Sequence, residues 1–169
     1  MDIVHIERIF KSLENAAVQY VVVGGLAVVA HGYLRFTADI DLFLNLEPDN
    51  LRKAVDVFTE LGYRPRIPVP IHDFISHKTR AEWIKEKNLK VFTLWNPSDP
   101  ILEIDLFVEA PMDFIEAEKN SVLFDMGSGV TIRVIGFDDL IALKLAAGRH
   151  RDIDDVENLR KVQRTRNEK

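Results

Sequence analysis

Apolar residues recur along the first third of the sequence at two different spacings. Residues 3–17 carry apolar side chains three or four positions apart, which predicts an amphipathic helix. Short β-branched runs predict strands, and the pair Gly24 and Gly25 ends the first of them. The elements predicted for this part are a helix over 3–17, a strand over 20–23, a helix over 26–31, a strand over 40–44 and a helix over 48–61.

The rest of the chain continues both patterns after a proline-rich interruption. Residues 64–77 contain Pro65, Pro68 and Pro70 and predict a stiff loop. Glycines at 127 and 129 predict the turn of a later hairpin, with Ser128 between them. The other predicted elements are a polar helix over 79–88, strands over 90–95 and 101–108, a short helix over 112–119, hairpin strands over 122–125 and 130–135, and helices over 137–147 and 152–164.

Strands and helices interleave, but hairpin connections also occur. We therefore expect an α+β fold, in which a mixed β-sheet packs against helices, rather than a doubly wound parallel fold. No linker or internal repeat divides the 169 residues. The sequence predicts one domain over residues 1–169, with residues 137–169 as its C-terminal helical part.

Composition excludes several classes of protein. The chain is 47% hydrophobic, which is enough for a real core and excludes wholesale disorder. It has no cysteine, which excludes disulfide scaffolds, zinc–thiolate sites and cysteine nucleophiles. The net charge of −5 argues against a general DNA-coating protein. No apolar run has the length of a membrane span and the start does not resemble a signal peptide, so we expect a cytoplasmic protein without a membrane partner.

Two aspartates carry the first chemical signal. Side chains alternate across a strand, so Asp39 and Asp41 point to one face of the predicted strand while Ile40 and Leu42 point to the other. Two carboxylates on one face repel each other unless a cation lies between them. Oxygen ligands without Cys or His favour Mg²⁺ or Mn²⁺ over zinc. An isolated Asp-x-Asp is more often simply solvated, so its neighbours decide the interpretation.

A later strand carries a second set of carboxylates. Alternation puts Glu103 and Asp105 on one face of the strand predicted over residues 101–108. If this strand lies beside residues 40–44, Asp105 completes a three-carboxylate site with the first two aspartates. Such a site can hold two divalent ions about 3.5–4 Å apart, the arrangement used for in-line phosphoryl displacement.

The Gly24–Gly25 turn is the third signal. Glycines let the backbone approach a phosphate closely, and the first N–H groups of a helix face an anion. The turn is not a Walker loop, because no Gly-Lys-Ser/Thr follows, and it lacks the spacing of the dinucleotide fingerprint. The informative feature is the order of a strand, a Gly-Gly turn, a helix, and then Asp-x-Asp on the next strand.

The run VVVGGLAVVAHGYLRFTADIDLFL resembles the signature of the polymerase-β-like nucleotidyltransferases, where a third Asp lies on a later strand. Among them it looks most like small prokaryotic members such as the AbiEii-type abortive-infection toxins and minimal nucleotidyltransferases. The later stretch LIALKLAAGRHRDIDDVENL resembles their helical motif of a Lys, an Arg and an Asp. The resemblance covers the N-terminal half through Asp105 and the last two helices, and no motif is placed between residues 62 and 90. It implies the polymerase-β-like fold.

The resemblance implies catalytic and metal-binding roles for Asp39, Asp41 and Asp105. All three bind Mg²⁺ or Mn²⁺ in this interpretation, and Asp105 also helps to deprotonate the acceptor hydroxyl. Asp154 matches the acidic position of the helical motif. A structural alternative stays open, in which Asp154 pairs with Arg149 or Arg151, and capping of the last helix accounts for Asp152 and Asp155.

The resemblance also implies a set of residues that bind the NTP substrate. Many family members have Ser where this chain has Gly25, and Thr37 is a candidate substitute as hydroxyl donor. Lys144 lies in an apolar helix, so it either contacts phosphate as a point charge or extends to solvent. The implied nucleotide-binding residues are Gly24, Gly25, Arg35, Thr37, Lys144 and Arg149.

These observations favour an enzyme that moves a nucleoside monophosphate from an NTP to a hydroxyl and releases pyrophosphate. Candidate acceptors are a tRNA end, a protein side chain or a small molecule such as an antibiotic. The subgroup resemblance adds the hypothesis of a toxin with an antitoxin protein as partner. The alternative is a non-catalytic descendant that binds a nucleotide or a partner, which the glycine at position 25 keeps open. A glycosyltransferase or a haloacid-dehalogenase-type phosphatase fits the motifs poorly.

Overall fold

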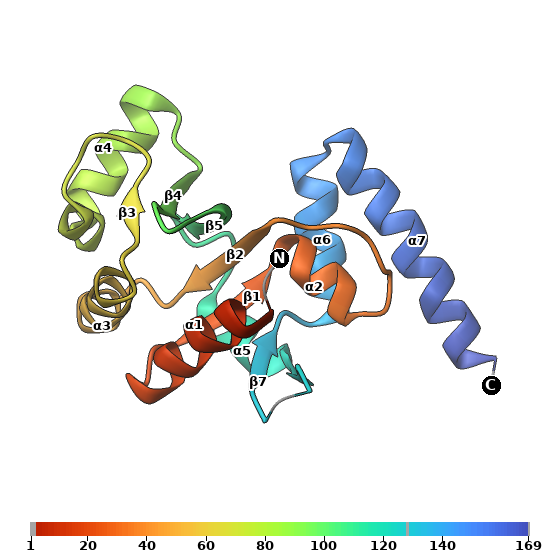
Figure 1. Cartoon of the computed structure of the whole chain (residues 1–169). Helices are drawn as coiled ribbons and strands as arrows, with labels where there is room; N and C mark the ends of the chain where they lie inside the picture. Colours follow the sequence, from red (N-terminus) through yellow and green to blue (C-terminus); the bar gives the residue numbers. More distant parts are fainter. Residues whose placement is uncertain (1–2, 128, 169) are drawn as a thin grey trace.

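The computed structural model describes residues 3–127 and 129–168 and has a central sheet with helices around it (Figure 1). The helices are α1 (Ile3–Asn15), α2 (Gly24–Ala30), α3 (Pro48–Glu60), α4 (His77–Lys87), α5 (Phe114–Asn120), α6 (Phe137–Ala147) and α7 (His150–Asn167), with a 3₁₀ turn η1 (Ile71–Ile75). The strands are β1 (Tyr20–Val23), β2 (Asp39–Leu44), β3 (Arg64–Pro65), β4 (Val91–Asn96), β5 (Asp99–Phe107), β6 (Val122–Asp125) and β7 (Thr131–Val134).

The strands of the described residues form one mixed sheet in the order β3-β4-β5-β2-β1-β7-β6. Strand β2 runs parallel to β5 and β1 runs parallel to β7, while the other neighbours are antiparallel. The expectation of a mixed sheet packed against helices is therefore confirmed. The parallel pairing of β2 with β5 matters most, because it joins two strands that are far apart in the sequence.

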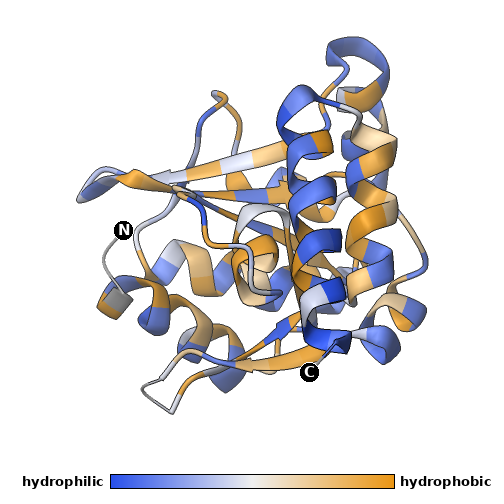
Figure 2. Ribbon diagram, turned by 90° about the vertical axis from the view of Figure 1, so that its right-hand side faces the viewer, coloured by the Kyte–Doolittle hydropathy of each residue, from blue (hydrophilic) through white to orange (hydrophobic). Residues whose placement is uncertain are grey.

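Burial follows the apolar pattern. Strand β1 is buried along its whole length, and β4 alternates between buried and partly exposed residues. One face of β4 and β5 therefore points into the core, and the other face stays open. The strands are largely hydrophobic in Figure 2, whereas α7 is largely hydrophilic. Helix α2 packs on β2 and α6, and α6 packs on α7, so these helices border the open face on one side.

The prediction of a loop over residues 64–77 is wrong in part. Residues Arg64 and Pro65 pair with β4 at the edge of the sheet, and Ile71–Ile75 forms the 3₁₀ turn. The reason is the burial of Phe74, whose ring stacks on Phe92 at 5.0 Å between centroids. Aromatic packing with a distant strand thus gives this proline-rich segment a fixed course that its local sequence does not indicate.

Helix boundaries differ slightly from the prediction. Helix α2 begins at Gly24 rather than at residue 26, and α7 begins at His150 and continues to Asn167. Between α6 and α7, Gly148 ends the first helix with a φ of 63°, which favours glycine. The hairpin of β6 and β7 is present, but its predicted turn residue Ser128 lies outside the described residues. None of the helices in the described part of the chain has the length and apolarity needed to cross a membrane.

Candidate active site

Three aspartates lie together on the open face of the sheet. In the parallel pairing of β2 with β5, Asp41 is opposite Asp105 and Asp39 is opposite Glu103. Paired residues on neighbouring strands point to the same side of a sheet, so the carboxylates share one face. The hydroxyl of Thr93, on β4, donates to Oδ1 of Asp105 at 2.6 Å. The adjacency of β2 and β5 expected from the sequence is therefore observed.

The electrostatics of this group reflect burial and crowding of like charges. The pKa of Asp105 is raised to about 6, mainly by burial and also by the charges of Asp41, Asp39 and Glu103, while the hydrogen bond from Thr93 opposes the rise. Metal-free Asp105 is therefore partly protonated near neutral pH.

Burial also raises the pKa of Asp41. The backbone N–H of Gly25 opposes the rise, Asp39 adds to it, and the positive charges of Lys144 and Arg149 lower it. Asp41 thus lies within electrostatic reach of both cations from the last two helices.

The donor chemistry of this face fits a divalent cation. Among the described residues, no three His, Cys, Asp or Glu side chains form a ready-made metal site. Asp41 and Asp105 nevertheless project from paired positions of adjacent strands, and their neighbours raise the pKa of each. A cation between carboxylates relieves this repulsion, and an oxygen-only donor set suits Mg²⁺ or Mn²⁺. Asp39, Asp41 and Asp105 are the residues that would hold such an ion.

The Gly24–Gly25 turn contacts Asp41. Gly24 has a φ of +61°, and a Cβ at this position would overlap the carboxylate of Asp41 and lie 2.8 Å from its Cβ. The backbone N–H of Gly25 donates to Oδ2 of Asp41 at 3.4 Å. Only glycine allows both this backbone conformation and this approach to the carboxylate. The contacts with Asp41 therefore fix the position of the turn relative to β2.

Thr37 fills the space next to Gly25. A Cβ on Gly25 would overlap the hydroxyl of Thr37, and it would lie 2.9 Å from the Cβ of Thr37 and 3.1 Å from Nη1 of Arg35. The side chains of Thr37 and Arg35 thus occupy the volume into which a serine at position 25 would project. The hydroxyl of Thr37 donates to the backbone oxygen of Asp39 at 3.4 Å, and its role as the hydroxyl donor of the turn stays a prediction.

A cluster of charges centred on buried Lys144 of α6 and buried Asp152 and Asp155 of α7 lies beside this turn. Lys144 Nζ contacts Asp152 Oδ1 at 3.1 Å and Asp155 Oδ2 at 2.7 Å. Arg35 Nε lies 2.7 Å from Asp155 Oδ1, and Arg149 Nε lies 2.7 Å from Asp152 Oδ2. We call these five residues the charge cluster. Its three cations and two carboxylates leave one net positive charge beside the aspartates.

The contacts of α6 and α7 correct three of the structural alternatives. Lys144 does not extend to solvent, since it is 6% exposed. Asp152 does cap α7, because its side chain accepts from the backbone N–H of Arg149, but Asp155 is held by ion pairs instead. Asp154 is exposed and contacts His150 at 3.2 Å, not Arg149 or Arg151.

Hydrogen bonding controls the ionisation of Asp152. Burial raises its pKa, but hydrogen bonds from Arg149 and Lys144 lower it more, so that its pKa lies below the usual range. The hydrogen bond to Asp152 in turn raises the pKa of Arg149. Both partners are therefore charged at neutral pH.

Sequence reasoning missed a second group on the open face. Arg66 donates from Nε to Glu103 Oε1 at 2.6 Å, and its guanidinium carbon lies 4.9 Å from the ring centroid of Trp95. Glu103 and Trp95 are both half-buried, and Glu103 lies two residues before Asp105 on the same face of β5. The alternation of side chains along β4 and β5 could have placed Trp95 and Glu103 on this face. No feature of the sequence indicated that Arg66 joins them.

A recess of about 410 Å³ lies away from this group. Glu14, Tyr20, Leu123 and Arg133 are among the residues that line it. Tyr20 begins β1, whereas Gly24 directly follows the end of that strand, so the recess lies at the opposite end of β1 from the aspartates. We therefore assign it no part in the candidate active site.

Comparison with known proteins identifies the class. The mixed sheet, with aspartates on two parallel strands beside a Gly-Gly turn, has the polymerase-β-like nucleotidyltransferase fold, which solved nucleotidyltransferases share. Residues 4–167 match the family described as nucleotidyltransferases of unknown function (DUF6036), and the chain belongs to this family. The family match includes residues 62–90, for which the sequence motifs gave no assignment. The AbiEii-type subgroup stays a prediction.

Three solved structures illustrate the likeness of fold. A protein of Thermotoga maritima assigned as a candidate nucleotidyltransferase is 17% identical, with 95% of this chain and 91% of that chain covered and a TM-score of 0.56. ANT(2″)-Ia in complex with adenylyl-2″-tobramycin is 15% identical over 95% and 92%, with a TM-score of 0.57. The lincomycin-bound lincosamide adenylyltransferase LnuA is 16% identical over 94% and 96%, with a TM-score of 0.57. A search of curated proteins gave no match.

Proposed function

We propose that this protein transfers a nucleoside monophosphate from an NTP to a hydroxyl group and releases pyrophosphate, with Mg²⁺ or Mn²⁺ as cofactor. The observation that carries the proposal is the group of Asp39, Asp41 and Asp105 on two paired parallel strands, with Asp41 in contact with the Gly24–Gly25 turn. Carboxylates that hold divalent ions beside an anion-binding turn are the parts that in-line phosphoryl displacement requires.

Each side of the site has a task in this proposal. Bound divalent ions supply charge neutralisation at the reacting phosphate. The backbone of Gly24 and Gly25, with the Thr37 hydroxyl and the Arg35 guanidinium, orients the triphosphate. Asp105 accepts the proton of the acceptor hydroxyl. Lys144 and Arg149 contribute positive potential beside Asp41 and the leaving pyrophosphate.

The acceptor binds, in this proposal, over the part of the open face formed by Thr93, Trp95, Arg66 and Glu103. This surface continues directly from Asp105 along β5 and β4 and combines an aromatic ring with polar groups. Such a combination suits a small organic molecule. A structural neighbour is named an adenylyltransferase of lincosamide antibiotics and another is bound to adenylylated tobramycin, which supports small hydroxylated molecules as the first acceptors to test.

The alternative of a non-catalytic nucleotide-binding protein depended on the glycine at position 25. The position of Thr37 weakens that alternative, because its hydroxyl occupies the place next to the turn. The role of a toxin, with an antitoxin as partner and tRNA or a protein as acceptor, stays a hypothesis from the subgroup resemblance.

The test is a transfer assay with two labels. Purified protein, Mg²⁺ or Mn²⁺, and each NTP labelled at the α-phosphate are incubated separately with total tRNA, total protein and a panel of hydroxylated small molecules. The proposal predicts that one pool acquires label from an α-labelled NTP and none from the same NTP labelled at the γ-phosphate. Label that enters only from the γ-phosphate, or no label in any pool, contradicts nucleotidyl transfer.

A further inference from the structure

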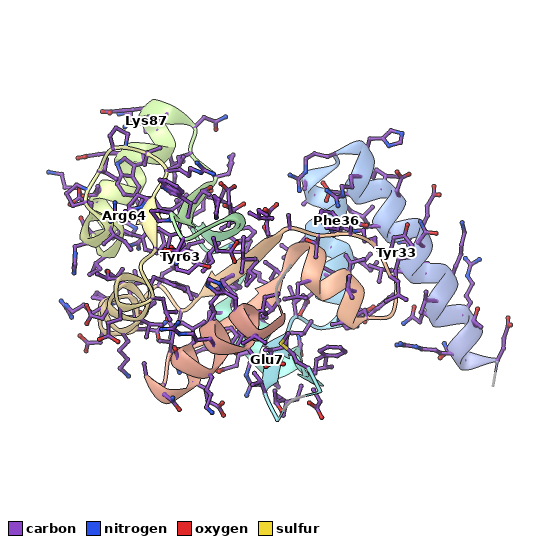
Figure 3. All side chains as sticks on the ribbon, viewed as in Figure 1. Glu7, Tyr33, Phe36, Tyr63, Arg64 and Lys87 are labelled. Carbon is purple, nitrogen blue, oxygen red and sulfur yellow. The ribbon has the colours of Figure 1, made fainter. Side chains whose placement is uncertain are left out.

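The segment between α2 and β2, residues 32–37, lies along α7 and is attached to it at several points. Arg151 donates to the backbone oxygen of Phe36 at 2.8 Å. A Cβ on Gly32 would lie 2.5 Å from Nη2 of Arg166, so the backbone of the segment touches α7 there. Figure 3 shows Tyr33 and Phe36 beside the last two helices. We call residues 32–37 the α7-bound segment.

Arg35 makes the buried connection in the middle of this segment. Asp155 contacts its guanidinium at two atoms: Nη2 donates a hydrogen bond to Oδ2 at 3.0 Å, and Nε forms an ion pair with Oδ1 at 2.7 Å without hydrogen-bond geometry. The third nitrogen, Nη1, donates to the backbone oxygen of Phe36 and lies 3.1 Å from the place of a Cβ on Gly25. One end of the guanidinium is thus fixed to α7 while the other end lies beside the Gly24–Gly25 turn.

Asp155 has a task within the charge cluster that Asp152 does not share. Lys144 forms ion pairs with both carboxylates, so it still has the ion pair with Asp152 if the carboxylate of Asp155 is removed. Among the described residues, Arg35 has Asp155 as its carboxylate partner, and the Asp155 side chain is only 1% exposed. A buried carboxylate with a two-point contact fixes the direction of a guanidinium much more firmly than solvent does.

We propose that Asp155 is a positioning residue of the nucleotide site. It holds Arg35 so that Nη1 and the neighbouring Thr37 hydroxyl both face the triphosphate at the Gly24–Gly25 turn. Helix α7 is then part of the nucleotide site through this contact, although Asp155 itself does not touch the substrate. This inference rests on the proposed function and adds the element that orients its phosphate-binding side.

The test is a double-mutant cycle on binding, which requires no acceptor. Calorimetry measures the Kd of Mg²⁺–ATP, the other Mg²⁺–NTPs and Mg²⁺–tripolyphosphate for the wild type, Asp155→Asn, Arg35→Ala and the double variant. We expect Asp155→Asn to weaken binding of the preferred NTP and of tripolyphosphate about tenfold. In the Arg35→Ala background the same change should have less than a twofold effect, because the group that Asp155 positions is gone.

Two further variants separate positioning from general damage to the fold. Asp152→Asn is a matched control, since Asp152 is equally buried in the charge cluster but does not contact Arg35. Asp152→Asn should change the Kd by the same factor in the wild-type and Arg35→Ala backgrounds, whereas the effect of Asp155→Asn should be lost in the Arg35→Ala background. Arg35→Lys keeps the positive charge but cannot make the two-point contact, so it should weaken binding as Asp155→Asn does. This variant also serves if Asp155→Asn does not fold.

The outcomes that overturn the inference are distinct. If the wild type binds the NTP and Asp155→Asn weakens binding equally with and without Arg35, Asp155 does not act through Arg35 and this inference alone is wrong. The inference is also wrong if a folded Asp155→Asn or Arg35→Lys protein binds the NTP with the affinity of the wild type. If the wild type binds neither any NTP nor tripolyphosphate, the proposed function fails, and this inference fails with it.

Discussion

At the scale of single residues, two glycines show how closely the backbone approaches the side chains of Asp41 and Thr37. Gly24 has a positive φ and leaves no space for a Cβ beside Asp41, whereas Gly25 leaves no space because Thr37 is there. The first restriction comes from both conformation and contact, and the second comes from contact alone. Substitutions at the two positions therefore have different expected results.

Replacing Gly24 by alanine should destabilise the protein by about 3 kcal/mol, because backbone strain adds to overlap with Asp41. The matched control is Gly62→Ala, where φ is +86° but the nearest atom, Nδ2 of Asn96, lies at an ordinary 3.5 Å. That control should cost only about 1 kcal/mol, the strain alone. Urea unfolding of both variants measures the difference. Equal losses of stability mean that the contact between the turn and Asp41 is absent.

Serine at position 25 should fit only if Thr37 is reduced. Gly25→Ser overlaps the Thr37 side chain and should cost about 2 kcal/mol of unfolding free energy. Combined with Thr37→Ala, the same serine should recover at least half of that cost and supply a hydroxyl close to the original one. Urea unfolding of the two single variants and the double variant tests this. Strictly additive losses contradict the proposed exchange of space between positions 25 and 37.

At the scale of elements, the sequence predicts most helices and strands, and it predicts the charge cluster poorly. Periodicity places both closing helices and the Asp-x-Asp strand because one face of each is apolar. It does not show that Lys144 and Asp155 are buried, since a charged residue is exposed by default. Here the ion pair between these two residues and the contact of Asp155 with Arg35 offset the cost of burial. Phe74 shows the same limit in the proline-rich segment, where packing on a distant strand determines the backbone course.

Removing the central cation of the charge cluster should be costly. Lys144→Met leaves Asp152 and Asp155 buried with one positive partner fewer each, and should lower the free energy of unfolding by about 3 kcal/mol. The control Lys53→Met changes an exposed lysine on α3 and should stay within about 0.5 kcal/mol of the wild type. Urea unfolding at pH 7.5 compares them. A loss in Lys144→Met no larger than in the control means that the lysine is solvated.

At the scale of the whole molecule, the sheet order brings together carboxylates that lie some sixty residues apart in the sequence. The order of strands along the chain does not by itself make β2 and β5 neighbours, since a strand over 101–108 has several possible places in a mixed sheet. The motif order and its family resemblance pointed to the pairing of β2 with β5, and the topology places Asp41 opposite Asp105. Because these paired carboxylates repel each other when both are ionised, their charge affects the free energy of unfolding.

Asp105→Asn should stabilise the metal-free protein at neutral pH. The folded pKa of Asp105, about 6, lies above its ordinary value of 3.8, so its ionisation destabilises the fold as pH rises from about 4 to above 6. The asparagine variant lacks this penalty and should be more stable than the wild type by about 1–2 kcal/mol at pH 7.5, after allowance for solvent screening. Unfolding measured in EDTA at pH 7.5 and pH 4 tests this. The gain should vanish at pH 4, and a gain that is independent of pH contradicts the account.

The central claim is that the aspartates of β2 and β5 catalyse nucleotidyl transfer, and the most direct measurement is pyrophosphate release with Mg²⁺, the preferred NTP and its acceptor. Asp41→Asn keeps the size of the side chain and removes the charge at the centre of the site. Asp56→Asn is the control, because Asp56 is exposed on α3 near His72. The account predicts that Asp41→Asn lowers the rate at least a hundredfold without lowering the melting temperature, while the control keeps the wild-type rate. A folded Asp41→Asn protein that releases pyrophosphate as fast as the wild type contradicts it.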